Sequence, residues 1–255
     1  YLPSGAPVAW KVDPNNQPRN IVRAAKTMSI LWWTMANRFD FVRESISRIH
    51  NVSVKVEDIS AVDFMYHRSG GEKDVYKVVL FTRDGRRVET CFDIAFKSPQ
   101  EGKTFDADRL QTSQQLHGSG LSPDYGGSMD VYFVPALGKA PDRIISEAEM
   151  KQLQQRGKVP KNAEKISFFF EEFIDGPTSQ ELYVAGKLSD THRSAIVENA
   201  LRMKQKLSGK IPIDFNRANY VFKEGTTEVR NVDLDKPRNL PIATVLHRLL
   251  NFYGY

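Results

Sequence analysis

The chain has 255 residues, 40% of them hydrophobic and 26% charged, which is typical of a globular protein with one large domain or two lobes. A net charge of +5 permits an acidic partner, but the basic residues are spread along the chain and give no clear nucleic-acid signal. The single cysteine, Cys91, excludes an internal disulfide framework and cysteine-rich zinc modules. No apolar stretch approaches the roughly 18 residues that a membrane helix needs.

The context of the protein is only weakly indicated. One cysteine fits a reducing compartment, and the sequence leaves the compartment otherwise unknown. Because the chain begins with Tyr1, we expect it to be a piece of a longer protein, so the absence of a targeting signal carries no weight. The oligomeric state is also left open.

The first 58 residues are expected to form an arm and a long helix. Four prolines in residues 1–18 indicate an extended arm, and apolar residues spaced by three and four predict one helix from a cap at Asn20 to about His50. Trp32 and Trp33 lie on different sides of that helix. Core contacts are the favoured interpretation for both; the alternative is that Trp33, with the basic stretch 151–161, is exposed to a partner.

A strand-rich block and then a mostly helical block follow, which predicts the α+β class. The expected strands are 52–56, 61–66, 75–82, 88–97, 129–135, 165–173, 220–222 and 228–232. The expected helices are 105–116, a helix capped by Ser146 within an insert at about 136–164, 189–207 and 242–252. The two parts are expected to join near residue 175.

Two polar features lie in the strand-rich block. The segment SGGEKD at 69–74 places Gly70 and Gly71 between two expected strands, where backbone N–H groups can approach a phosphate; a plain hairpin turn is the alternative. The strand IAFK ends at Lys97, and alternation puts Ala95 on the same side. A lysine there needs an anion or must extend to water, as a strand-end lysine can.

Two further polar features lie in the second block. Asp214 and Asn219 stand five residues apart in a turn that leads into a strand, and Asp233 follows a short apolar strand. Carboxylate and amide oxygens suit a hard cation such as Mg²⁺, whereas solvent-facing turns rich in Asp and Asn are the ordinary alternative.

In this order, the four features resemble the protein-kinase-like superfamily, which includes protein kinases and the aminoglycoside and choline phosphotransferases. VYKV at 75–78 resembles its second strand, IAFK its Val-Ala-Ile-Lys, and FEEFIDG at 170–176 its hinge. The stretch from Asp214 to Val221 and the DLD at 233–235 resemble its metal-binding motifs. The resemblance covers roughly residues 60–235.

The resemblance implies a two-lobe fold with an N-terminal helical extension. Residues 1–58 would be the extension, 59–175 the strand-rich N-lobe with the insert at about 136–164, and 176–255 a minimal helical C-lobe. Only 22 residues follow Asp233, which leaves no room for an activation loop. This small size resembles the effector kinases that bacterial pathogens secrete into the host-cell cytosol as virulence factors.

The resemblance also implies roles for individual residues with ATP and Mg²⁺ as cofactors. Asp214 and Lys97 would be catalytic, and Asn219 and Asp233 would hold Mg²⁺. The ATP-binding residues would be Gly70, Gly71, Val75, Ala95, Lys97, Glu172 and Ile174. The acidic partner of Lys97 would lie on the following helix, with Asp108 the first choice and Asp106 and Glu101 as rivals.

Several residues depart from the family pattern. Pro212 replaces a histidine found in many relatives, Asp235 replaces the glycine of Asp-Phe-Gly, and the glycine loop lacks the usual spacing. The expected activity is transfer of phosphate from ATP, with a protein as acceptor and an activating protein partner as one means of control. The alternatives are a nucleotide-binding pseudokinase or interaction module, nucleotidyl transfer or ligation, and a small-molecule acceptor.

Overall fold

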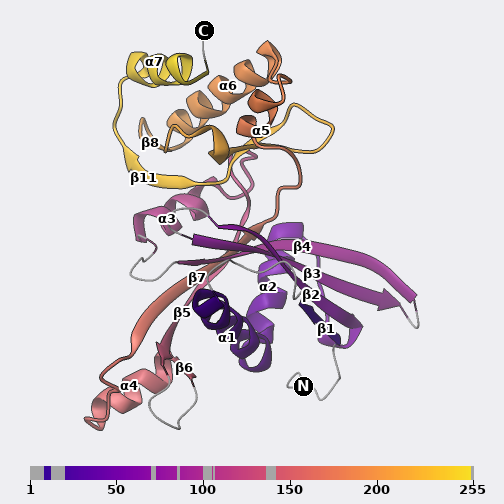
Figure 1. Cartoon of the computed structure of the whole chain (residues 1–255), viewed down its shortest axis with the longest axis vertical. Coiled ribbons are helices and arrows are strands. Elements are labelled where there is room, and N and C mark those ends of the chain that lie inside the picture. The colour runs from indigo at the N-terminus through magenta and orange to yellow at the C-terminus, as the bar shows by residue number, and fades with distance from the viewer. Residues whose placement is uncertain are drawn as a thin grey trace. The chain divides into compact units, whose positions relative to one another are not determined.

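A computed structural model describes residues 9–12, 21–69, 73–84, 87–99, 105, 107–135 and 142–253. It is a mixed α and β protein, as predicted. The chain divides into two compact units (Figure 1). Unit 1 comprises Tyr1–Phe105 and Gly126–Glu171, and unit 2 comprises Asp106–Tyr125 and Glu172–Tyr255. Residues 106–125, which the sequence-based division places in the strand-rich part, therefore belong to unit 2.

Unit 1 is built on one seven-stranded sheet. Its strands are β1 (Ala9–Val12), β2 (Ile59–Ser69), β3 (Lys73–Asp84), β4 (Arg87–Pro99), β5 (Tyr125–Val134), β6 (Arg143–Ser146) and β7 (Glu164–Glu172). They lie in the order β1-β2-β3-β4-β7-β5-β6. The pairs β2–β3, β3–β4 and β5–β6 are antiparallel, and β1 runs parallel to β2. β7, which comes last in sequence, therefore lies between β4 and β5.

Two helices, α1 (Ile21–Asn37) and α2 (Phe39–His50), cover one face of this sheet (Figure 1). Their apolar side chains pack with those from alternate positions of the strands, such as Tyr76, Phe96 and Phe168. Burial of this apolar surface is the main source of stability for unit 1, at roughly 25 cal/mol per Å². The three aromatic rings lie 5.2 to 6.4 Å apart along the chain of contacts from Tyr76 through Phe96 to Phe168.

The prediction of one long N-terminal helix is wrong in one respect, because the helix is interrupted at Arg38. Arg38 has a non-helical backbone (φ −138°, ψ 34°), and the break allows Met35 and Phe39, on either side of it, to be fully buried. α2 also lies very close to β5. A Cβ at Gly126 would come within 2.8 Å of Ile49, so only glycine allows this approach.

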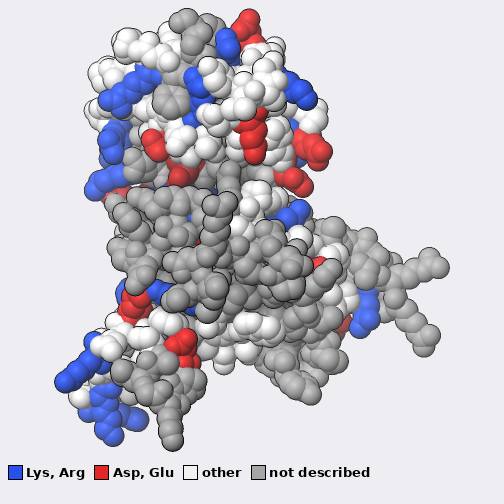
Figure 2. Space-filling view, viewed as in Figure 1, with Lys and Arg blue, Asp and Glu red and all other residues white. Residues whose placement is uncertain are grey.

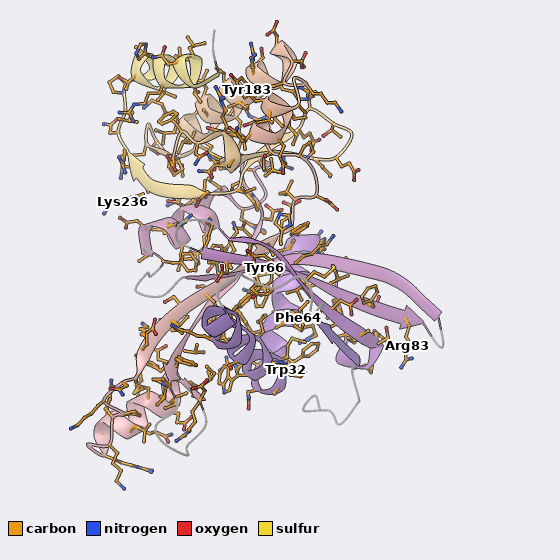
Figure 3. All side chains as sticks on the ribbon, viewed as in Figure 1. Trp32, Phe64, Tyr66, Arg83, Tyr183 and Lys236 are labelled. Atoms are coloured by element: carbon orange, nitrogen blue, oxygen red, sulfur yellow. The ribbon has the colours of Figure 1, made fainter. Side chains whose placement is uncertain are left out.

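Trp32 is the more exposed of the two tryptophans, at 48%, whereas Trp33 is half-buried and packs on the core of unit 1 (Figure 3). The interpretation that Trp33 is the exposed one is therefore wrong. The expected strand at 52–56 is also absent. The Val54 carbonyl accepts a hydrogen bond from the Arg43 guanidinium at 3.0 Å instead of pairing in a sheet.

The insert of unit 1 contains β6 and α4 (Glu147–Gln155). The predicted cap is confirmed, since the Ser146 hydroxyl accepts a hydrogen bond from the Glu149 N–H at 3.1 Å. Residues 136–141 lie outside the described part of the chain.

Unit 2 is mostly helical, with two small sheets. Its helices are α3 (Ala107–Leu116), α5 (Ser179–Val184), α6 (Asp190–Lys206) and α7 (Ile242–Tyr253). Its strands are β8 (Ile211–Ile213), β9 (Tyr220–Phe222), β10 (Val229–Asn231) and β11 (Leu234–Arg238), and two 3₁₀ turns occur in the chain at Val56–Asp58 and Arg217–Asn219. β8 pairs with β11 and β9 with β10, both antiparallel.

The core of unit 2 joins α6 to these strands. Ile196, Ala200 and Met203 of α6 are fully buried against apolar residues of β8, β9 and α7. Asn199, also buried, donates hydrogen bonds to the carbonyls of Leu121 and Val229, which ties α6 to the segment after α3 and to β10. Ser189 caps α6, as predicted from the sequence.

Among the residues that the structure describes, no helix combines the length and the apolar composition needed to cross a bilayer.

Candidate functional site

The predicted nucleotide-contact residues of β3 and β4 lie on one face of the sheet. Val75 stands opposite Lys97 in the β3–β4 register, and Ala95 precedes Lys97 by two residues on β4. Because side chains alternate along a strand, all three point away from the core that α1 and α2 cover. Each is buried, with an exposed fraction of 6% or less.

The Lys97 ammonium forms an ion pair with the carboxylate of Glu171, which β7 places beside it. The two side chains are only 4% and 8% exposed. The ammonium also lies 5.6 Å from the centre of the Phe169 ring, and Phe105 packs edge-on against the same ring at 4.7 Å. A charged lysine can be buried at this strand end because an acid and an aromatic face surround it.

The expected helix partner of Lys97 is not seen in this pair. Asp108, on α3, forms an ion pair with Lys236 at 3.1 Å within unit 2. Asp106 and Glu101, the rival candidates, lie outside the described residues. A contact of Lys97 with Asp108 stays a prediction, because the two residues belong to different units.

The predicted phosphate loop cannot be assessed in full. Gly70 and Gly71 lie outside the described residues. The two residues that follow the loop, Lys73 and Asp74, begin β3 and are both buried. Counted from β2, the hairpin that carries this loop is followed by the strand of Lys97, so the lysine is on the third strand of a meander.

The predicted hinge residues Glu172 and Ile174 lie where the chain leaves β7. The Glu172 N–H donates to the Asp124 carbonyl at 2.8 Å, and the Glu172 carboxylate accepts from the Asp124 N–H at 3.2 Å. Burial raises the pKa of Glu172 above its usual value of 4.5, and the hydrogen bond from Asp124 only partly opposes this. Within the described part of the chain, the N–H of Ile174 donates no hydrogen bond.

The three predicted polar residues of unit 2 lie close together. Asp214 follows β8, Asn219 ends a 3₁₀ turn, and Asp233 immediately precedes β11. The Asn219 amide lies 3.5 Å from the Asp214 carboxylate, and the Asn219 carbonyl accepts a hydrogen bond from the N–H of Val232 at 2.8 Å. Since Ile213 pairs with Leu234, the β8–β11 register brings Asp214 and Asp233 to neighbouring positions.

Asp233 makes an ion pair that the sequence does not reveal. Its carboxylate binds the guanidinium of Arg109 on α3, and its N–H donates to the Asn231 side chain at 3.0 Å. The Arg109 side chain is 11% exposed and that of Asp233 is 34% exposed. The Asp233 carboxylate is thus oriented by α3 and remains in contact with water.

Oxygen ligands of Asp214, Asn219 and Asp233 have the chemistry that Mg²⁺ prefers. Among the described residues, no group of three or more His, Cys, Asp or Glu side chains is placed to hold a metal ion. A metal at this position would therefore need the Asn219 amide and oxygens from a bound phosphate to complete its ligands.

Glu171 and Arg109 are the two residues that sequence reasoning missed. A signal for Glu171 exists: it lies on the non-core side of the FFFEE run, two residues after Phe169, and a buried lysine requires an acid on an adjacent strand. Arg109 has no such signal, because its contact depends on how α3 packs on β11.

No protein-family model matches this chain, and no curated protein matches it.

Proposed function

We propose that this protein is an ATP- and Mg²⁺-dependent phosphotransferase with a two-lobe, protein-kinase-like fold. Units 1 and 2 would be its lobes, and the nucleotide would contact residues of both. The sequence resemblance motivates the proposal, and the local geometry of each unit supports it.

The observation that carries the proposal is the convergence of Asp214, Asn219 and Asp233 in unit 2. They are 19 residues apart in sequence from first to last, and the β8–β11 pairing and the hydrogen bond from Val232 to Asn219 bring them together. Phosphoryl transfer requires charge neutralisation and in-line positioning of the acceptor, with little covalent help from the protein. In this role Asp214, which is exposed, orients the acceptor hydroxyl, while Asn219 and Asp233 hold Mg²⁺.

Unit 1 supports the proposal through the position of Lys97. A lysine on the third strand after a glycine loop, paired with a carboxylate, is the arrangement that positions the α- and β-phosphates in kinases. Val75 and Ala95 lie on the same face and offer small apolar surface for a purine ring. The departure is the pair itself, since the carboxylate comes from β7 and not from the helix after Lys97.

One observation favours a second candidate, a nucleotide-binding interaction module without transfer activity. Arg109 neutralises Asp233, the residue expected to bind Mg²⁺. If this pair persists when nucleotide binds, the metal loses its main carboxylate ligand. Chemistry then stops, while the face around Lys97 remains able to bind ATP.

We propose a protein as the acceptor of the transferase. The stretch after Asp233 carries Lys236 and Arg238, both exposed, and this basic surface does not suit a cationic small molecule. An acidic region of a protein is the more compatible substrate.

The experiment follows transfer of labelled γ-phosphate from ATP to proteins of a cell extract, with Mg²⁺ present. Asp214→Asn and Asp233→Asn should each lower the rate by about 10²-fold or more, since a positioned acid–base group contributes about that much. Asp190→Asn, whose side chain is 88% exposed, is the matched control and should retain the parental rate. Binding of ATP with no transfer under any condition would favour the interaction module.

A further inference from the structure

Unit 2 contains a polar cavity that lies outside the set of residues discussed so far as the transfer site. It has a volume of about 510 Å³ and lies between α3, the end of α6 and β11. Cavities of several hundred Å³ accommodate small ligands of the size of a sugar phosphate or nucleotide. Its lining residues are Asp108, Gln111, Thr112, Gln115, Lys206, Leu207, Ser208, Lys210 and Pro237.

Five of these side chains have hydrogen-bonding capacity to spare. Within the described part of the chain, none of the following takes part in a hydrogen bond or ion pair through its side chain: Gln111, Gln115, Lys206, Ser208 and Lys210. The two glutamines stand four residues apart and so share one face of α3. Two ammonium groups, two amides and one hydroxyl can therefore all donate to one ligand.

The lysines are not needed to neutralise the end of α6. Lys204 already serves that purpose, because its ammonium binds the carbonyls of Gly209 and Leu240. The backbone of the turn is also satisfied, with the Gly209 N–H on the Lys204 carbonyl at 2.8 Å and the Lys210 N–H on the Leu207 carbonyl at 3.1 Å. Lys206 and Lys210 are thus surplus positive charges.

The charge around the cavity favours an anion. Its single lining carboxylate, Asp108, is paired with Lys236 at 3.1 Å. Arg238 pairs in register with Ile211, which places it beside Lys210 across β8 and β11. Figure 2 shows Lys and Arg side chains along the side of unit 2 where Figure 1 draws β8 and β11, and Lys236 projects outward there in Figure 3.

We propose that this cavity binds a phosphorylated small molecule, with Lys206 and Lys210 as the charged contacts and Gln111, Gln115 and Ser208 as neutral donors. Ammonium groups form charge-assisted hydrogen bonds with phosphate oxygens, and amides and hydroxyls provide the remaining donors. The inference does not depend on the proposed transferase activity, because no residue assigned to that activity lines the cavity.

The test is isothermal titration of the full chain with inorganic pyrophosphate at fixed ionic strength, with EDTA in place of Mg²⁺. The parental protein should bind one equivalent, and added NaCl should weaken the affinity by screening the exposed lysines. The Lys206→Gln/Lys210→Gln variant should bind at least about tenfold more weakly, because its charge-assisted contacts are lost. Both lysines are exposed, so this variant should fold normally, which circular dichroism checks.

Three further variants make the test specific. Lys158→Gln/Lys161→Gln removes the same charge from exposed residues of unit 1 and should bind like the parental chain. Asp233→Asn should also bind like the parental chain, which separates this cavity from the transfer site. Ser208→Gly removes one donor where φ is +53°, a conformation that suits glycine, so binding should weaken while the fold is retained. No binding at millimolar pyrophosphate, or equal binding by the Lys206→Gln/Lys210→Gln variant, overturns the proposal.

Discussion

Each unit holds one ion pair that involves a residue expected to act on ATP, and the two pairs differ in burial. In unit 1, Lys97 and Glu171 are 4% and 8% exposed, whereas Asp233 of unit 2 is 34% exposed beside Arg109. Removing one partner of a buried pair leaves an unsolvated charge, while a pair in contact with water contributes little. The Lys97 pair is therefore part of the fold of unit 1, and the Asp233 pair is exchangeable.

The largest expected effect comes from breaking the buried pair. Lys97→Met should lower the free energy of unfolding by about 3–5 kcal/mol, because Glu171 is left buried without a counter-charge. Lys97→Met/Glu171→Leu should recover most of that loss. Urea denaturation measures both, and a single variant within about 1 kcal/mol of the parental chain would contradict a structural role for the pair.

The second effect tests how the chain enters unit 2. Gly176 has φ +146°, and a Cβ there would overlap the carbonyl oxygen of Phe222. Gly176→Ala should therefore cost about 2 kcal/mol or more beyond the cost of Gly157→Ala. Gly157 is the matched control, since it also has a positive φ, +64°, but a Cβ would meet nothing within 4 Å. Equal losses in thermal denaturation would show that the close approach to Phe222 is unimportant.

The third effect concerns the exchangeable pair. Arg109→Gln should change stability by no more than about 1 kcal/mol, since Asp233 remains solvated. With ATP present, the variant should require less Mg²⁺ for half-maximal stabilisation, because the metal no longer competes with the guanidinium. Arg202→Gln, which removes an exposed pair with Glu198 at 3.9 Å, is the control. A loss of stability as large as that of Lys97→Met would show that both pairs are structural.

The smallest effect is a pH dependence of opposite sign in the two units. Burial alone would raise the pKa of Asp130 in unit 1, but hydrogen bonds from Lys165 at 2.6 Å and Ser167 at 2.6 Å and the charge of Lys165 outweigh it and lower the pKa. Asp130 therefore stabilises the fold above its usual value of 3.8, and this contribution is lost as the pH falls through the lowered pKa.

The pKa of Glu172 in unit 2 is raised, so its ionisation destabilises the fold as the pH rises from 4.5 through the raised pKa. Urea denaturation across the acid range should show Asp130→Asn losing stability only at the higher pH values and Glu172→Gln gaining it there. The same sign for both variants would contradict the assigned environments.

The sequence predicts the local structure of this chain well where periodicity or a cap carries the signal. The strand that ends at Lys97, the cap at Ser146 and helix α6 are all found close to their expected bounds. The break at Arg38 and the strand β11 were not expected, because both depend on tertiary packing and not on a local pattern. β11 exists through its pairing with β8, a contact between residues more than 20 apart in the chain.

The candidate site divides in the same way. The grouping of Asp214, Asn219 and Asp233 could be anticipated, because their order and spacing match a known motif and their strands are short. The contacts of Glu171 and Arg109 with the expected functional residues could not be read from spacing alone. They follow from strand order in unit 1, where β7 lies next to β4, and from the packing of α3 on β11 in unit 2.

The central claim is that the exposed Asp233 carboxylate can exchange Arg109 for Mg²⁺ when ATP is bound. Thermal denaturation of the parental chain and of Asp233→Asn, each in buffer, with ATP alone and with ATP plus Mg²⁺, tests it most directly. The account predicts extra stabilisation of the parental chain by ATP plus Mg²⁺, about 2.7 kcal/mol at a hundredfold excess over the dissociation constant. Asp233→Asn should lose the Mg²⁺-dependent part. A folded parental protein that no nucleotide stabilises, with or without Mg²⁺, would contradict the account.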